Sequence, residues 1–148
     1  MKFVCDAMLG KLARYLRILG LDADYTGGAG LPEHYNNDVE PPYFLTRRTK
    51  GTHYDRAIII KSEKTPDQIR EIGEIIRPYI NPQEIMNRCI ECNVGLVDVD
   101  KMDVEQLVPE FIFHRYRVFR MCPRCRKIYW EGSHAEGMAE LVREIMET

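Results

Sequence analysis

The chain has 148 residues, 45% of them hydrophobic and 30% charged, with a formal net charge of −2 at pH 7. This composition excludes a disordered chain, and no apolar run is long enough to cross a bilayer, so we expect no membrane span. The length suits one ordinary domain, or a compact domain with a small appended module. Charged side chains interrupt the apolar stretch near the N-terminus, which makes it a poor secretion signal, and we expect a cytoplasmic protein.

Four short apolar runs in the first half of the chain predict β-strands. The clearest is the run of β-branched residues that begins at Ala57. A loop with one helical turn near Pro32 is expected between the second and third strands. The strands are expected at residues 2–6, 21–26, 43–46 and 57–61.

Two helical patterns accompany these strands. The first runs from about Ala7 to Leu19, with Gly20 as a natural stop. The second begins at Thr65, which we expect to be the N-cap, with Pro66 in the first helical position. Because strands alternate with helices, we predict an α/β domain with a parallel sheet and flanking helices. The buried faces are expected to contain Met8, Leu12, Tyr15, Leu16 and Leu19, and Ile69, Ile72, Ile75, Ile76 and Tyr79.

The pattern changes in the last third of the chain, where short apolar pieces surround paired cysteines. Residues 111–119 alternate in a two-faced pattern that predicts a strand. The stretch from Ser133 to Glu136 forms a capping box that opens a terminal helix, with Met138 and Leu141 on its apolar face. We therefore expect a small second domain with a terminal helix.

Two cysteine pairs of equal spacing lie in this second segment: Cys89 with Cys92, and Cys122 with Cys125. A gap of two residues lets a tight turn direct two thiolates at one point, and two such turns supply the four sulfur ligands of a structural zinc ion. The spacing between the pairs suits a zinc ribbon, whose folding depends on the metal. Redox dithiols and disulfides are the alternatives, but the flanking residues favour turns over a helix start, and we expect an intracellular protein with reduced thiols.

A run of positive charge surrounds the second cysteine pair. Residues 114–127 contain six basic side chains and no acid, which is compatible with nucleic-acid binding, although charge alone is better explained by a solvated face. Tyr116, Tyr129 and Trp130 can stack on unpaired bases, whereas packing inside the ribbon is the simpler explanation for Trp130. The candidate phosphate-binding residues here are Arg115, Arg117, Arg124, Arg126 and Lys127.

The sequence resembles the Mut-seven C-terminal ribonuclease domain family, which consists of PIN-like proteins with a zinc ribbon fused at the C-terminus. The segments that carry the resemblance are, in order, FVCDAMLGKLARYLRILGLDADY, FLTRR, IIIKSEKTPDQIREI, RCIECNVGL and MCPRCRKIYWEGSH. The resemblance implies a PIN-like α/β domain over residues 1–81, and a four-cysteine zinc ribbon with a C-terminal helix over residues 82–148. It also implies RNA as the partner and phosphodiester hydrolysis with Mg²⁺ or Mn²⁺.

In such nucleases, acids at the carboxyl ends of parallel strands hold the metal, which activates a water and neutralises charge on the phosphate. Asp6 matches the first acid, because it ends one strand and precedes a helix, although its carboxylate can also cap that helix. The candidates for the remaining acids are Asp22, Asp38 and Glu63, and further candidate phosphate contacts are Lys11, Arg14, Arg47 and Arg48.

The chain departs from the family pattern at one position. Family members read Thr-Arg-Asp where this chain has Thr46, Arg47 and Arg48, so a cation replaces a metal-binding acid. Two interpretations follow: a metal-dependent ribonuclease with an altered acid set, or an RNA-binding module that contacts phosphates through Arg47 and Arg48. A third, from a different class, is a non-catalytic adaptor whose zinc ribbon binds a protein partner.

Overall fold

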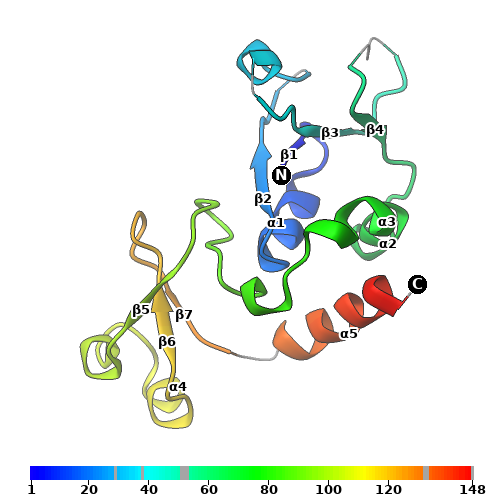
Figure 1. The fold of residues 1–148 in the computed structure, drawn as a ribbon. Coiled ribbons are helices and arrows are strands. Elements are labelled where there is room, and N and C mark those ends of the chain that lie inside the picture. The colour runs from blue at the N-terminus through cyan, green and yellow to red at the C-terminus, as the bar shows by residue number, and fades with distance from the viewer. Residues whose placement is uncertain (29, 38, 51–53, 132–133, 148) are drawn as a thin grey trace.

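The computed structural model describes residues 1–28, 30–37, 39–50, 54–131 and 134–147. Its first half is built on a parallel sheet with the strand order β2-β1-β3-β4 (Figure 1), which confirms the predicted α/β arrangement. Because β1 lies between β2 and β3, its carboxyl end is the switch point of the sheet, where open α/β sheets place their ligands. The strands are β1 (Lys2–Cys5), β2 (Asp22–Tyr25), β3 (Tyr43–Thr46) and β4 (Ala57–Ile59).

Helices cover one face of this sheet. Their apolar side chains form one buried core with Phe3, Cys5 and Leu45 of the strands. The last helix returns from the second half of the chain and adds Met138 and Leu141 to this core (Figure 1). None of the described helices is both long and apolar enough to span a membrane. The four helices are α1 (Gly10–Ile18), α2 (Thr65–Glu71), α3 (Gly73–Ile76) and α5 (His134–Glu147).

The opposite face of the sheet is covered by irregular chain. Successive strand residues point to opposite faces, so Val4 and Phe44 pack on this side, against Tyr35. Tyr35 lies in a short 3₁₀ helix, η1 (Glu33–Asn37), which agrees with the turn predicted near Pro32.

The second half forms a small antiparallel sheet in the order β5-β6-β7. Its own core contains Val104, Ile112, Phe119 and Ile128. The strands are β5 (Val97–Val99), β6 (Phe119–Met121) and β7 (Ile128–Tyr129), and the 3₁₀ helix η4 (Lys101–Val104) and the helix α4 (Glu110–Arg115) connect the first two. Two 3₁₀ turns, η2 (Arg77–Tyr79) and η3 (Pro82–Glu84), lead from the first half to the second.

The strand predicted over residues 111–119 is wrong for most of its length. Residues 110–115 form α4, and extended pairing begins only at Phe119. The N–H groups of Ile112 and Phe113 both donate to the carbonyl of Pro109, which starts the helical turn. Only Ile112 of this helix is buried, and Phe111 is 70% exposed, so the alternation of aromatic residues does not reflect a buried face.

The predicted boundaries of the first two helices also need correction. α1 begins at Gly10, which leaves Met8 outside the helix and 72% exposed. Thr65 is the first helical residue and makes no capping hydrogen bond. Gln68 is buried, and its amide donates to the carbonyl of Ser62, 3.0 Å away. Tyr79, expected on the buried face of this helix, lies in the later 3₁₀ turn η2 and is 37% exposed.

Candidate functional site

The four paired cysteines converge in the ribbon, where their sulfur atoms all lie within 4.8 Å of one another. A tetrahedral zinc ion with Zn–S bonds of about 2.3 Å needs sulfur atoms about 3.8 Å apart. The Sγ atoms of Cys89 and Cys125 are 3.7 Å apart, and all four cysteines are free thiols. The donor set and its spacing therefore fit a structural zinc ion held by Cys89, Cys92, Cys122 and Cys125.

The two cysteine turns share one backbone geometry. In each turn the N–H of the second cysteine donates to the sulfur of the first, at 3.4 Å. The next residue, Asn93 or Arg126, has a positive φ of 58° or 68° and donates its N–H to the carbonyl of the first cysteine. Hydrogen bonds to sulfur favour the thiolate that a metal needs, so the turns are shaped for metal binding.

A tyrosine that the sequence did not assign to this site also contacts the cluster. The hydroxyl of Tyr129 donates to Cys89 Sγ at 3.1 Å and accepts from the N–H of Ile90 at 3.2 Å. Burial alone would raise the pKa of Cys89, but Tyr129 and two backbone N–H groups donate to its sulfur and lower the pKa to about 7. Cys89 is thus readily deprotonated, and the ring of Tyr129 is fixed beside it.

Asp6 lies directly after β1, at the switch point of the sheet, and its side chain is only 3% exposed. Its Oδ1 accepts a hydrogen bond from the N–H of Ala7 at 2.8 Å, and its Oδ2 accepts one from the hydroxyl of Thr46 at 2.7 Å. Because α1 begins only at Gly10 and has no side-chain cap, Asp6 is not the N-cap of that helix.

The turn after β3 places a cation beside Asp6. Arg48 Nε lies 3.5 Å from Asp6 Oδ2, and the N–H of Arg48 donates to the Thr46 hydroxyl at 3.1 Å. Arg47 is directed elsewhere, since its guanidinium donates to the carbonyl of Ser62. A divalent ion here would have to share Asp6 with a permanent positive charge, so the described residues around Asp6 do not fit Mg²⁺ or Mn²⁺.

Of the other candidate acids, Asp22 and Glu63 are described, and among the described residues neither forms a metal-binding cluster with Asp6. Asp22 begins β2 and pairs in register with Lys2, at the opposite end of the strands. Its Oδ1 lies 3.5 Å from the Lys2 ammonium and accepts a hydrogen bond from Asn93 at 2.8 Å. Glu63 is exposed and lines a groove that Asp6 does not line. Asp38 lies outside the described residues.

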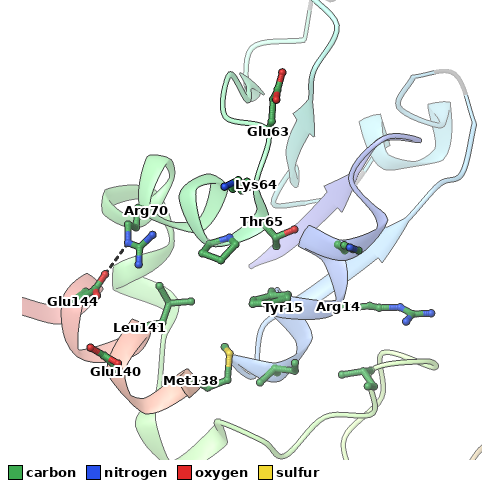
Figure 2. A pocket seen from close by; sticks show the side chains of 14 residues that line it. Arg14, Tyr15, Glu63, Lys64, Thr65, Arg70, Met138, Glu140, Leu141 and Glu144 are labelled. Atoms are coloured by element: carbon green, nitrogen blue, oxygen red, sulfur yellow. Dashed lines mark hydrogen bonds and ion pairs between the residues drawn. The ribbon is translucent and has the colours of Figure 1, made fainter. Parts of the chain in front are cut away.

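That groove, of about 1000 Å³, lies between α1, the start of α2 and α5 (Figure 2). Lys11, Arg14 and Lys64 contribute positive charge to its lining. Arg14 pairs at 3.7 Å with Glu91 of the first cysteine turn, and Arg70 pairs with Glu144 across the groove at 2.8 Å (Figure 2). Within the described ranges, no carboxylate forms an ion pair with Lys11 or Lys64. These two cations are therefore available to an anionic ligand.

The predicted basic patch of the ribbon is exposed. Arg115 lies 5.7 Å from the centre of the Tyr116 ring, and Lys127 lies 5.5 Å from that of Tyr129. No acid in the described part of the chain forms an ion pair with any residue of the patch. The patch consists of Arg115, Arg117, Arg124, Arg126 and Lys127, all exposed.

A family model described as the Mut7-C RNase domain matches residues 1–142, which is nearly the whole chain. The chain belongs to the Mut7-C RNase domain family. No curated protein and no solved structure is significantly similar to it. Membership confirms the resemblance predicted from the sequence and gives this Mut7-C protein a nucleic-acid-related function.

Asn93 is a further residue of this Mut7-C protein that the sequence did not predict, and it joins the two halves. Its side chain accepts from the N–H of Ala23 at 3.1 Å and donates to Asp22 at 2.8 Å and Asp24 at 3.1 Å. Arg17 donates to the carbonyl of Ala23 at 2.8 Å and to that of Ile90 at 2.7 Å. The first cysteine turn thus supplies an acceptor for one N–H group on the open edge of β2. An asparagine after a cysteine pair indicates a positive φ. The hydrogen bonds of its side chain to distant residues could not be predicted, because nothing in the neighbouring sequence indicates them.

Proposed function

We propose that this Mut7-C protein binds single-stranded RNA and does not hydrolyse it through a metal ion at Asp6. The proposal is carried by the ion pair between Arg48 and the buried Asp6. Hydrolysis by a nuclease of this type needs a metal ion that activates water and neutralises charge on the phosphate. Here a guanidinium occupies that place beside the carboxylate, and a guanidinium also binds phosphate oxygens well.

The exposed cations of both halves support the binding part of this proposal. The ribbon patch consists of unpaired basic side chains among the described residues, and Lys11 and Lys64 add charge in the groove beside α1. Contacts of this kind neutralise phosphates and release counterions, so they account for affinity without base specificity. The aromatic residues beside the patch favour single strands over duplexes, because only unpaired bases expose their faces.

The test is the salt dependence of binding to a labelled single-stranded RNA. Each phosphate contact contributes a slope of about −0.7 to the plot of log K against log salt for single strands. We expect the double variant Arg117→Gln with Arg124→Gln to reduce the steepness by about 1.4 and to weaken binding. The variant Lys61→Gln with Arg143→Gln, which removes the same charge from exposed positions on the α/β half, should bind like the parent.

Two results would contradict the proposal. A flat salt response would remove RNA as the partner and favour the protein-adaptor interpretation. Cleavage of the RNA in Mn²⁺ that is abolished by Asp6→Asn would show that a metal functions at Asp6 despite Arg48.

A further inference from the structure

A cavity of about 510 Å³ lies between the end of α1 and the ribbon. Its volume falls in the range of pockets that bind small ligands. Tyr116, Tyr129 and Trp130 line it together with Arg88 and Lys127, and no acid is among its lining residues. Of the phosphate contacts proposed above, Lys127 alone lines this cavity, which combines aromatic walls with two positive charges.

The aromatic side chains that line the cavity are held by contacts with the cysteine site and the ribbon core. Tyr129 is fixed by its hydrogen bond to Cys89 Sγ. Trp130 packs against Phe119, with ring centres 6.4 Å apart, and Tyr116 packs on the same ribbon core. Rings that are already ordered lose little entropy when a ligand stacks on them, so the cavity is prepared for a flat partner.

The two cationic side chains of the cavity differ in how firmly the structure holds them. Arg88 is half-buried and donates to the carbonyl of Asn93 at 2.7 Å, so its charge is fixed beside the cavity. Lys127 is exposed, and its ammonium lies 5.5 Å from the centre of the Tyr129 ring. A ligand that combines a flat ring with a negative charge satisfies both features, because the ring stacks while an anionic group meets the lysine.

The backbone at the cavity wall is also unusual. Met86, one of the lining residues, has a φ of 65° and donates its N–H to the carbonyl of Ile18 at 2.8 Å. A left-handed conformation is unfavourable for a residue with a side chain. Such conformations cluster at ligand-binding sites, where the surrounding structure maintains them.

We infer that this cavity binds one unpaired nucleobase of the RNA strand, with its ring against Tyr116 and Trp130 and its phosphate near Lys127. The inference rests on the proposed RNA binding and adds a base-binding site to it. The binding surface then has two parts. Exposed cations bind the phosphates, and one cavity binds a single unpaired base, which favours single-stranded over duplex RNA.

The protein contains one tryptophan, and it lines the cavity, so its fluorescence reports directly on stacking. The experiment titrates the zinc-loaded full chain with a labelled single-stranded RNA, and with an abasic strand of equal length and charge. Anisotropy of the label measures binding, and Trp130 emission measures occupation of the cavity. We expect the base-bearing strand to quench Trp130 and to bind about tenfold more tightly than the abasic strand, which should not quench.

Substitutions at Tyr116 separate stacking from packing. Tyr116→Leu keeps apolar volume against the ribbon core but removes the ring, and should weaken binding of the base-bearing strand about tenfold while leaving the abasic strand unchanged. Tyr116→Phe should restore the parent affinity. Phe111→Ala is the matched control, because Phe111 is an aromatic residue of the neighbouring helix α4 that is 70% exposed and does not line the cavity.

Equal binding of both strands with unchanged Trp130 emission would overturn the base-binding site while leaving RNA binding intact. Failure of either strand to bind would overturn the proposed function, and the cavity inference with it. Equal effects of Tyr116→Leu on both strands would likewise overturn the inference, since they would reflect a structural role.

Discussion

Thr46 connects the two groups that set the chemistry of the sheet edge. Its buried hydroxyl donates to Asp6 and accepts from the N–H of Arg48, so it orients both members of the ion pair. Replacing it with valine keeps the shape but leaves a buried carboxylate oxygen without its donor. A loss of this kind costs about 1–3 kcal/mol.

We therefore expect Thr46→Val to lower the free energy of unfolding by about 1–3 kcal/mol, measured by urea denaturation. Thr46→Ser retains the hydroxyl and should recover most of the loss. Equal stability of Thr46→Val and the parent would mean that the hydrogen bond from Thr46 to Asp6 does not stabilise the fold.

Asp24 makes stability depend on pH. Burial would raise the pKa of Asp24, but hydrogen bonds from Tyr35, Lys2 and Asn93, with the charge of Lys2, lower it below its ordinary value. A carboxyl group with a lowered pKa stabilises the fold above its unfolded-state pKa of about 3.9, and this contribution disappears as the pH falls through the folded-state pKa.

Stability should therefore fall below about pH 4, and Asp24→Asn should reduce the size of that fall. Urea denaturation at pH 7 and pH 3 gives the change in unfolding free energy for the parent and for the variant. Contributions from the other titrating groups cancel when these two changes are subtracted. The same loss of stability in the variant and the parent would contradict this role of Asp24.

At the residue scale, the sequence predicts which side chains have a local role better than it predicts which distant residues those side chains contact. Asp6 follows a strand and the cysteines follow a spacing rule, so their local roles could be predicted. Asp22 shows the limit, because parallel register places it beside Lys2 and the ribbon rather than beside Asp6. Register is a long-range property, and one strand of four residues contains no signal for it.

At the scale of elements, the first cysteine turn is both a metal site and a connector. The positive φ of Asn93 shapes the turn, and its side chain makes hydrogen bonds to the edge of β2. Alanine removes these bonds and also disfavours the backbone conformation, whereas glycine removes the bonds alone.

We expect Asn93→Ala to destabilise the protein by about 2–4 kcal/mol, and Asn93→Gly by about 1 kcal/mol less. Thermal or urea unfolding of the zinc-loaded variants gives both values. Asn93→Gly as stable as the parent would show that the side-chain bonds to β2 contribute nothing.

Zinc removal tests the ribbon as an element. Among the described residues, its core cluster has four buried side chains, and in such a small unit metal binding supplies folding free energy. We expect a chelator to shift Trp130 emission to longer wavelength, as the ring separates from Phe119 and meets water, and added zinc to reverse the shift. Unchanged emission after zinc is lost would show that the ribbon folds without metal.

The four strands of the first sheet could be predicted from apolar runs because each run is short and bounded by turn residues. α4 could not, because six residues with alternating aromatic side chains satisfy a strand pattern although Pro109 starts a helical turn. The apolar stripe of α5 is visible in the sequence. The residues that it packs against lie far away in the chain, so the sequence does not show that α5 joins the core of the parallel sheet.

At the scale of the whole molecule, the two halves are joined by buried contacts as well as by the chain. Arg17 and Asn93 connect the ribbon to β2, and α5 returns to complete the core of the sheet. Metal binding in the ribbon therefore positions the base-binding cavity relative to α1. The central claim concerns the carboxyl end of β1, where the guanidinium of Arg48 lies beside Asp6 and excludes a metal ion.

Manganese binding tests that claim most directly. Titration of Mn²⁺ into the zinc-loaded protein, followed by electron paramagnetic resonance of the free ion, should show no binding at Asp6 in the parent. Arg48→Asp should gain one bound Mn²⁺, which a further Asp6→Asn substitution removes, while the neighbouring charge reversal Arg47→Asp should gain none. A parent protein that binds Mn²⁺, and loses it on Asp6→Asn, would contradict the account.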